Sequence, residues 1–190
     1  MNETRPVREG IHLFRRLYRA REAAVRGRDI DLIHYRTALV AEEKPVVDAI
    51  QRRGFDHIGV GAGRVVFRVP ESDTVVKVAR YGDTPADDGR WQNQNEWRTW
   101  NEAGDGLNLA PVCDADETGW SYVVMPEYEP LADVLADDPE QQSQLVTALQ
   151  SQLLDAGVFV ELLDIREANI GVDGESVVLF DYGASGTREY

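Results

Sequence analysis

The spacing of apolar residues changes at Phe55, and this change constrains the fold more than any other feature. Beyond it, three runs rich in β-branched residues follow one another, each of strand length. A glycine-rich turn separates the first two runs, and a Pro-Glu-Ser-Asp turn separates the second from the third. Short strands joined by short turns predict a three-stranded antiparallel meander. The runs are His57–Val60, Arg64–Val69 and Thr74–Arg80.

The following segment extends this sheet around one helix. After a polar loop at 81–89, Arg90–Ala103 is predicted to be a helix in which Trp97 and Trp100 face the core. The proline-flanked segment 126–130 then acts as a stiff connector. We therefore predict a five-stranded antiparallel sheet with one inserted helix over residues 55–126. Its last two strands are expected at Leu109–Cys113 and Ser121–Met125.

Residues 1–54 are predicted to form a helical extension. Apolar residues from Val7 to Val25 recur at helical spacing among arginines, which predicts a first helix. A second helix is expected to begin with Asp29 as its N-cap and to break before Pro45. A third would run over Pro45–Arg53, with proline at its first position.

Residues 127–190 combine one helix with short strands. Leucines at helical spacing predict a helix over Pro139–Ala156, followed by a strand at Val158–Val160. A further apolar strand, Val177–Phe180, lies between two polar turns. The chain is thus predicted to be α+β, in three segments at 1–54, 55–126 and 127–190.

Charge is distributed unevenly along the chain. Residues 1–54 carry twelve Arg and Lys against eight Asp and Glu (net +4), whereas residues 55–190 carry a net −18. An acidic body repels nucleic acid, so we do not expect a nucleic-acid partner. A basic arm suggests an acidic protein partner, another copy of the chain or its own body, although a solvated helix has the same composition. Eighteen arginines against two lysines, with a net charge of −14, resemble the composition of proteins from salt-loving organisms.

Two absences in the sequence bear on location. No basic-then-apolar leader pattern occurs, and no apolar run approaches the roughly 20 residues of a membrane helix. Cys113 is the only cysteine, which excludes an internal disulfide. We expect a soluble, intracellular protein that is neither secreted nor bound to a membrane.

The segment 162–183 concentrates polar side chains around a short strand. Asp164 precedes Asn169 by five residues, and Asp181-Tyr182-Gly183 follows the strand. Carboxylate and amide oxygens in this arrangement suit a divalent metal and phosphate. Asp, Asn and Gly are equally the residues of two tight turns around a hairpin, so this segment alone leaves both interpretations open.

The glycine turn contains Gly59, Gly61 and Gly63. Glycine lets backbone N–H groups approach phosphate oxygens without interference from a Cβ atom. A glycine-rich hairpin turn without any ligand has the same composition. Arg64, directly after the turn, is either a surface residue or a further phosphate contact.

Lys77 is the only lysine beyond residue 54, and it lies in the middle of an apolar strand. A compact ammonium group on a flexible stem suits a contact to phosphate and an ion pair with one carboxylate. An outward-facing lysine on an edge strand is the alternative. Glu96, on the following helix, is placed to reach back to that strand, although a helix glutamate is more often solvated.

The order of these features resembles the protein-kinase signature, namely glycine turn, strand lysine, helix glutamate, hinge, Asp-x4-Asn and Asp-x-Gly. The chain is most similar to the compact kinase-like proteins of phages and haloarchaeal viruses. There a glycine turn runs into an Arg-Val-Val-aromatic strand, then Val-Lys-Val, then a helix with Gly, Gln-Asn and Glu. The matching segments here are Gly61–Phe67, Val76–Val78 and Gly89–Glu96. The resemblance covers residues 55–183.

The resemblance implies an ATP site with Mg²⁺. Gly59, Gly61 and Gly63 would cover the nucleotide phosphates, and Lys77 would hold the α- and β-phosphates while paired with Glu96. The hinge residues that would contact adenine are Met125, Glu127 and Tyr128.

The resemblance also implies the catalytic and metal-binding residues. Asp164 would orient or deprotonate an acceptor hydroxyl, and Asn169 and Asp181 would bind Mg²⁺. Gly183 would permit the turn after the metal ligand. Phosphoryl transfer requires positioning and neutralisation of charge rather than covalent help, which is why these residue types recur.

The chain also departs from the kinase pattern. The third glycine of the loop pattern falls on Arg64, Leu162-Leu163 replace the usual His-Arg, and Tyr182 is the central residue of Asp-x-Gly. Seven residues follow Gly183, so we expect a truncated C-lobe without activation segment or helical platform. Two functions remain: a minimal ATP-dependent phosphotransferase with an unknown hydroxyl acceptor, or a non-catalytic kinase-like binding module with a structural or regulatory role. For either function, the resemblance implies a location in the cytoplasm of a host cell or in a virion.

Overall fold

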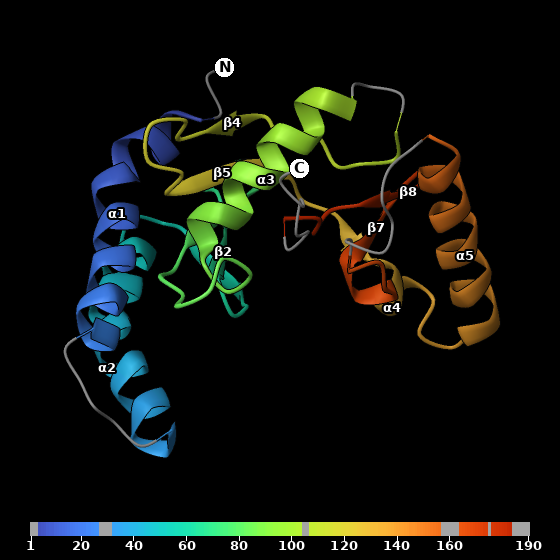
Figure 1. The fold of residues 1–190 in the computed structure, drawn as a ribbon. Coiled ribbons are helices and arrows are strands. Elements are labelled where there is room, and N and C mark those ends of the chain that lie inside the picture. The colour runs from blue at the N-terminus through green and yellow to red at the C-terminus, as the bar shows by residue number, and fades with distance from the viewer. Residues whose placement is uncertain (1–3, 27–31, 104–106, 157–163, 175, 184–190) are drawn as a thin grey trace.

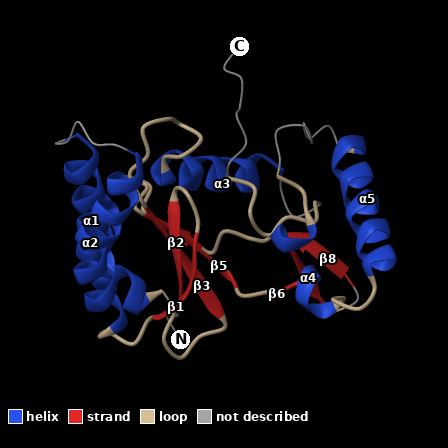
Figure 2. Ribbon diagram, turned by 90° about the horizontal axis from the view of Figure 1, so that it is seen from below, coloured by secondary structure: helices blue, strands red, loops and turns tan. Residues whose placement is uncertain are grey.

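The computed structural model describes residues 4–26, 32–103, 107–156, 164–174 and 176–183. The described elements form layers, in which a pair of N-terminal helices lies on one side of a five-stranded sheet (Figure 1). A three-stranded sheet with its own helices lies on the other side (Figure 2). Every strand pairing within the two sheets is antiparallel.

The larger sheet confirms the predicted meander. Its strand order is β1-β2-β3-β5-β4, so β3 lies at the centre and is hydrogen-bonded on both edges. A register shift between His57 and Gly59 interrupts the first pairing near the glycine turn. The strands are β1 (Asp56–Val60), β2 (Arg64–Arg68), β3 (Thr74–Ala79), β4 (Asp114–Ala115) and β5 (Tyr122–Pro126).

The prediction for the fourth strand was wrong. Instead of Leu109–Cys113, β4 comprises only Asp114–Ala115, and Leu109 forms a parallel bridge with Leu179. Pro111 has no N–H group to donate to a ladder, which prevents regular pairing along the predicted run.

The N-terminal segment forms two long helices rather than three. They are α1 (Arg5–Arg26) and α2 (Leu32–Gln51), and Pro45 lies inside α2. The predicted break before Pro45 was therefore wrong, and the predicted cap at Asp29 lies outside the described residues. A proline inside a helix costs about 3 kcal/mol. Burial of Val46 and Ile50 on the following turns offsets this loss.

One core lies between these helices and the sheet. Side chains alternate across a strand, so Val76 and Val78 of β3 face the helices while Val75 and Lys77 face the opposite side. Phe14 of α1 packs edge-on against Phe55 and Tyr122, with ring centroids 5.7 and 5.8 Å apart. The apolar face of α1 is thus buried against the larger sheet of the same chain.

Polar contacts also join α1 to the body. Arg15 pairs with Asp116 through Nη2 and Oδ1 at 2.9 Å, and Arg8 contacts Asp114 at 3.1 Å. The Tyr18 hydroxyl donates to Asp88 Oδ2 at 2.7 Å. Part of the positive charge of α1 is therefore paired with carboxylates of the same chain.

Arg80 links α2 to the glycine turn. Its guanidinium makes two hydrogen bonds, of 2.8 and 2.7 Å, to the buried carboxylate of Glu43 on α2. The same guanidinium donates to the carbonyl oxygen of Gly61. The turn is consequently held from the helix side of the sheet.

The smaller sheet follows the connector and has the order β6-β7-β8. Helix α5 has Asp138 as its N-cap, which accepts a hydrogen bond from the Gln141 N–H at 2.9 Å, and Pro139 at its first position. Leu149 and Leu153 of α5 pack against this sheet. The elements are β6 (Glu129–Pro130), α4 (Leu131–Val134), α5 (Pro139–Asp155), η2 (Glu167–Asn169), β7 (Ile170–Asp173) and β8 (Ser176–Leu179).

This part of the chain was predicted less completely than the larger sheet. The long helix is confirmed, and the last strand begins one residue earlier than expected. The connector itself contributes β6, and α4 was not predicted. The predicted strand at Val158–Val160 lies outside the described residues, and the division of the chain at residue 126 stays a prediction.

Among the described residues, no helix is both long enough and apolar enough to cross a bilayer.

Asp116 provides a test of how α1 is attached. Burial alone would raise its pKa, but hydrogen bonds from Arg15, Ser121 and Thr118 hold this pKa well below the ordinary value. A carboxylate with a lowered folded-state pKa contributes stability above its unfolded pKa, and this contribution is lost as the pH falls through the folded pKa. We expect Asp116→Asn to lower the free energy of unfolding by about 1–3 kcal/mol at pH 7.

The difference between wild type and Asp116→Asn should shrink on acidification below about pH 4, where the unfolded carboxyl begins to bind its proton. Urea unfolding at several pH values measures it. Glu117→Gln, an exposed neighbour with the same loss of charge, is the control and should change stability little. A difference for Asp116→Asn that does not change with pH would contradict this account.

Candidate active site

Lys77 lies on the central strand, so it is not an edge-strand lysine. Its neighbours across the ladder are Val66 on β2 and Val123 on β5. Only 4% of the residue is exposed. A buried ammonium group requires a partner, because burial without one is strongly unfavourable.

Helix α3 (Gly89–Ala103) supplies this partner. It begins after the loop that follows β3, and the Gly89 N–H donates back to the Arg80 carbonyl oxygen at 2.9 Å. Asp88 Oδ1 accepts hydrogen bonds from Arg90 N and Trp91 N at 3.0 and 3.3 Å. A Cβ atom on Gly89 would lie 1.9 Å from the Gly63 carbonyl oxygen, so only glycine permits this close start. The helix is thereby held against the end of the meander.

The most buried side chains of α3 are polar. Trp100 is partly buried and packs against the core of the smaller sheet as expected, whereas Trp97 is partly buried and packs against Trp120, with ring centroids 5.5 Å apart. The buried polar positions of the helix, which were not predicted, are Gln92, Asn93, Asn95 and Glu96. Asn93 donates to the Trp120 carbonyl oxygen at 2.9 Å. The polar face arises because this side of the helix faces a charged strand residue rather than an apolar layer.

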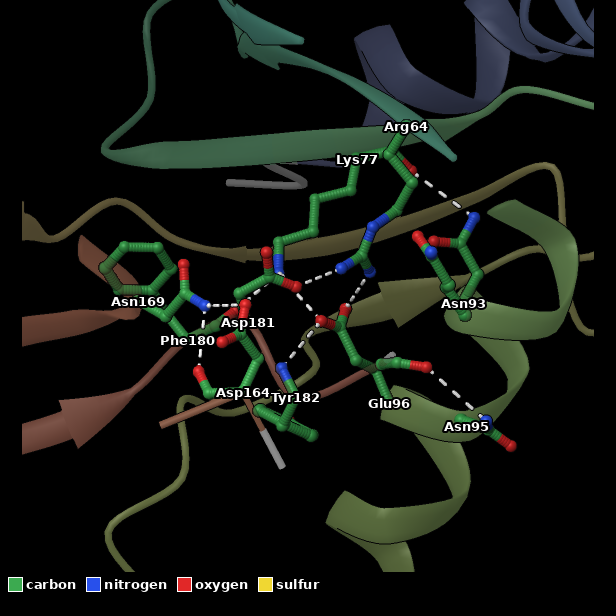
Figure 3. Close-up of polar contacts among 12 residues, drawn as sticks. Arg64, Lys77, Asn93, Asn95, Glu96, Asp164, Asn169, Phe180, Asp181 and Tyr182 are labelled. Carbon is green, nitrogen blue, oxygen red and sulfur yellow. Dashed lines mark hydrogen bonds and ion pairs between the residues drawn. The ribbon is translucent and has the colours of Figure 1, made fainter. Parts of the chain in front are cut away.

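Four charged residues meet beneath β2 and β3, and we call them the charge quartet: Arg64, Lys77, Glu96 and Asp181 (Figure 3). Lys77 Nζ donates to Glu96 Oε1 at 2.8 Å and lies 3.9 Å from Asp181 Oδ1. Arg64 Nη1 forms an ion pair with Glu96 Oε2 at 2.8 Å, without hydrogen-bond geometry. Arg64 Nη2 contacts Asp181 Oδ1 directly.

The quartet is balanced, with two cations and two carboxylates. Burial lowers the pKa of Lys77, and Arg64 lowers it further, against the opposing effect of Glu96. Burial would raise the pKa of Asp181, but the charges of Arg64 and Lys77 outweigh it and leave this pKa below its usual value. Asp181 is therefore ionised at neutral pH.

Asp164 and Asn169 are joined by direct hydrogen bonds. Asn169 Nδ2 donates to the Asp164 carbonyl oxygen at 2.8 Å and to Asp164 Oδ2 at 3.0 Å, which closes the loop between them. Arg166 Nη2 contacts the same Asp164 oxygen at 3.0 Å. The Phe180 N–H donates to the Asn169 carbonyl oxygen at 3.0 Å, and this bond places the loop beside Asp181.

A cavity of about 550 Å³ lies between the two sheets, and most of the predicted site residues line it. Ile58, Val66 and Val75 add apolar wall, and Arg166 and Phe180 lie at its polar end. The predicted residues that line it are Gly59, Gly61, Lys77, Met125, Glu127, Tyr128, Asn169 and Asp181.

Three predicted residues lie outside this lining. Glu96 is buried behind Lys77, and Asp164 lies behind Asn169. Gly63 approaches α3 instead, where a Cβ atom would lie 2.7 Å from both the Asp87 carbonyl oxygen and Gln92 Oε1. Its observed contact is thus with the start of the helix, and its phosphate contact stays a prediction.

The described residues of this cavity offer few protein ligands for a divalent metal. Among the described residues, no group of three or more His, Cys, Asp or Glu side chains is placed to hold an ion. Mg²⁺ commonly takes one or two protein oxygens and completes its shell with phosphates and water. The oxygens of Asn169 and Asp181 fit that arrangement, so the residues present suit a metal that arrives with a nucleotide.

Arg64 is the functional residue whose role the sequence reasoning missed. It is neither a surface residue nor, in this structure, a residue of the cavity lining: it is 5% exposed and paired with two carboxylates. The alternation of side chains along β2 indicates the face of the sheet on which Arg64 lies. Val65 and Phe67 face the helices, so Arg64 and Val66 belong to the face that bears Lys77.

Comparison with known proteins gives structural neighbours only. No protein-family model matches the chain, and no curated protein sequence matches it. Similar solved structures include two of the Mycobacterium tuberculosis PknI kinase domain, one of a mutant (TM-score 0.43, 20% identity) and one not so described (0.42, 18%). Another is Cex1p (TM-score 0.48, 13% identity).

These matches are partial in length. They cover 72% of this chain against 62% and 61% of the two PknI chains, and 70% of this chain against 26% of Cex1p. Protein kinase domains are thus among the structural neighbours of a mixed α/β chain with a five-stranded antiparallel sheet. These neighbours assign no function to the chain, so a functional proposal must be based on the geometry of the site.

Glu96→Gln should be the most destabilising conservative change in the charge quartet. Glu96 faces two buried cations, and loss of its charge leaves both with only the partly exposed carboxylate of Asp181, which costs about 3–5 kcal/mol. Lys77→Met should cost less, because Glu96 keeps Arg64 and an apolar side chain fills the space. Urea unfolding measures both.

Glu102→Gln, an exposed change on the same helix, serves as the matched control and should lie within about 0.5 kcal/mol of wild type. Equal stability of Glu96→Gln and Glu102→Gln would show that the buried quartet does not form.

Proposed function

We propose that the chain binds ATP with Mg²⁺ in the cavity between its two sheets and transfers the γ-phosphoryl group to a hydroxyl acceptor, as a kinase-like phosphotransferase. One observation carries the proposal: Lys77, held by Glu96 behind it, lines the same cavity as Asn169 and Asp181. A cation suited to phosphate, its carboxylate partner and two oxygens suited to a metal thus come together from β3, α3, η2 and the segment after β8. Phosphoryl transfer requires this kind of positioning.

The mouth of the cavity suits a nucleotide base. Val66, Val75 and Met125, which lie on one face of the larger sheet, offer apolar surface to a flat ring. The N–H group of Glu127 already donates to the Asp73 carbonyl oxygen at 2.9 Å. The backbone N–H of Tyr128 is therefore the candidate donor to adenine, in place of that of Glu127.

The phosphates would lie toward Lys77 and the glycine turn. Gly59 and Gly61 line the cavity, and a Cβ atom at either would meet no protein atom closer than 3.9 Å, so a ligand has room to approach the turn. The Gly61 N–H already donates to the Arg64 carbonyl oxygen at 2.8 Å, so this group would have to leave that bond to bind a phosphate. Bound Mg²⁺ would neutralise phosphate charge. Asn169 and Asp181 would hold it through their side-chain oxygens.

Asp164 would act on the acceptor. Its side chain is half exposed, and one oxygen is oriented by Asn169 and Arg166. A carboxylate fixed in this way can accept the proton of an acceptor hydroxyl as the phosphoryl group is transferred. The acceptor is a hydroxyl group on a protein or small molecule.

A second candidate function is a non-catalytic kinase-like binding module. The contact of Arg64 with Asp181 favours it, since a carboxylate held by an arginine is less available to a metal. In this role the exposed arginines of α1, such as Arg16 and Arg19, would bind an acidic protein partner or another copy of the chain. A virion or the cytoplasm of a salt-loving host is the setting we propose for either function.

Nucleotide binding tests the proposal directly. ATP with Mg²⁺ should raise the melting temperature, because a ligand at 100 times its Kd adds about 2.7 kcal/mol to the free energy of unfolding. Lys77→Ala should abolish this shift, whereas Asp164→Asn should keep it and lose only phosphoryl transfer. Calorimetry in molar KCl and release of ADP provide the two measurements.

The outcomes separate the two candidates. Asp133→Asn, an exposed carboxylate outside the cavity lining, is the control for loss of charge and should behave as wild type. Absence of any ATP-dependent shift in wild type would refute both nucleotide binding and transfer. Binding without ADP release or labelled acceptor, with candidate partners present, would favour the binding module.

A further inference from the structure

Arg64 has no place in the proposed chemistry, although it is buried at the centre of the site. It is the first residue of β2, directly after the glycine turn, and points from the sheet toward α3 (Figure 3). Its two terminal nitrogens contact different carboxylates, Nη1 that of Glu96 and Nη2 that of Asp181. A planar guanidinium is suited to bridge two acids in this manner, whereas an ammonium group acts as a single point charge.

The charges show what this bridge does. Without Arg64, the quartet would keep one cation, Lys77, against two carboxylates, and its net negative charge would oppose an incoming phosphate. With Arg64, the quartet is neutral before any ligand binds. Arg166 lines the same cavity but is paired with Asp164, so it does not replace Arg64. Like charges interact strongly when they lie a few ångströms apart in a partly buried site, so this difference is large for a polyanion.

Arg64 also keeps its charge under all ordinary conditions. Burial alone would lower its pKa, but the neighbouring Glu96 and Asp181 raise it above the usual arginine value. The side chain of Asp181 is 39% exposed, which leaves part of the carboxylate accessible to an ion from the cavity. An arriving cation and Arg64 therefore compete for one carboxylate.

We propose that Arg64 is a resident counter-cation for Asp181: it allows nucleotide phosphates to bind without a divalent metal, and Mg²⁺ ligates Asp181 only by displacing it. The proposal rests on the nucleotide binding proposed above and determines how that site depends on metal. In Arg64→Gln, the free carboxylate of Asp181 repels phosphate unless a metal neutralises it.

Calorimetric titration of ATP in the presence of EDTA or of MgCl₂ tests this. Wild type should change its Kd by less than about threefold between the two conditions, whereas Arg64→Gln should bind at least about tenfold more weakly in EDTA than in MgCl₂. The double variant Arg64→Gln/Asp181→Asn should lose that metal dependence again, because the repelling carboxylate is gone. Arg16→Gln, an exposed arginine on α1, is the charge-matched control.

A second readout needs no nucleotide. Mn²⁺ binding, followed by electron paramagnetic resonance of the free ion, should be stronger in Arg64→Gln than in wild type by about tenfold, and should disappear in the double variant. Equal Mn²⁺ binding in wild type and Arg64→Gln would overturn the competition between arginine and metal.

The results also distinguish this proposal from the proposed function. ATP binding by wild type only with MgCl₂ overturns the role of Arg64 and leaves nucleotide binding intact, whereas no binding in either condition refutes the proposed function itself. If circular dichroism shows that Arg64→Gln does not fold, Arg64→Lys replaces it, since lysine keeps the charge but contacts one carboxylate. That variant should show at least about threefold metal dependence, and none would overturn the proposal.

Discussion

The buried carboxylate of Glu96 is the interaction on which the rest of the site depends. Both of its oxygens lie 2.8 Å from cations, Lys77 on β3 and Arg64 on β2. Its Oε1 also accepts the Tyr182 N–H at 3.3 Å, which draws the end of the described chain toward α3. A charge without access to water must be matched locally, so the two strands, the helix and the segment after β8 are each held by the same group.

The parts of the fold that were predictable have local causes. Strand runs ended by turn residues identified the meander, and leucines at helical spacing identified α5. The errors occurred where distant contacts override local preference. Burial against the sheet stabilises α2 as a continuous helix in spite of Pro45. Leu109 pairs with Leu179, which is seventy residues away in the chain, instead of extending the larger sheet.

Most residues of the candidate site could be identified from the sequence, but most of the ion pairs between them could not. Composition singled out Lys77, and the motif order suggested Glu96, which the structure brings to 2.8 Å. The same reasoning assigned Trp97 to the core, because a polar face directed at a buried lysine cannot be recognised until the lysine's direction is known. Arg64 was missed for a related reason: alternation along β2 places it on the same face as Lys77, but only the position of α3 and of Asp181 shows that this end of the face is buried.

The hydrogen bonds of Arg80 make the two faces of the larger sheet mechanically dependent on each other. Glu43 on the outer helix, Arg80 at the end of the central strand and the Gly61 carbonyl form a continuous polar chain from the back of the sheet to the cavity. A glycine turn can normally adjust to its ligand independently of the remaining fold. Here the turn is hydrogen-bonded through Arg80 to Glu43 on α2, so the position of this helix and the shape of the cavity wall depend on each other.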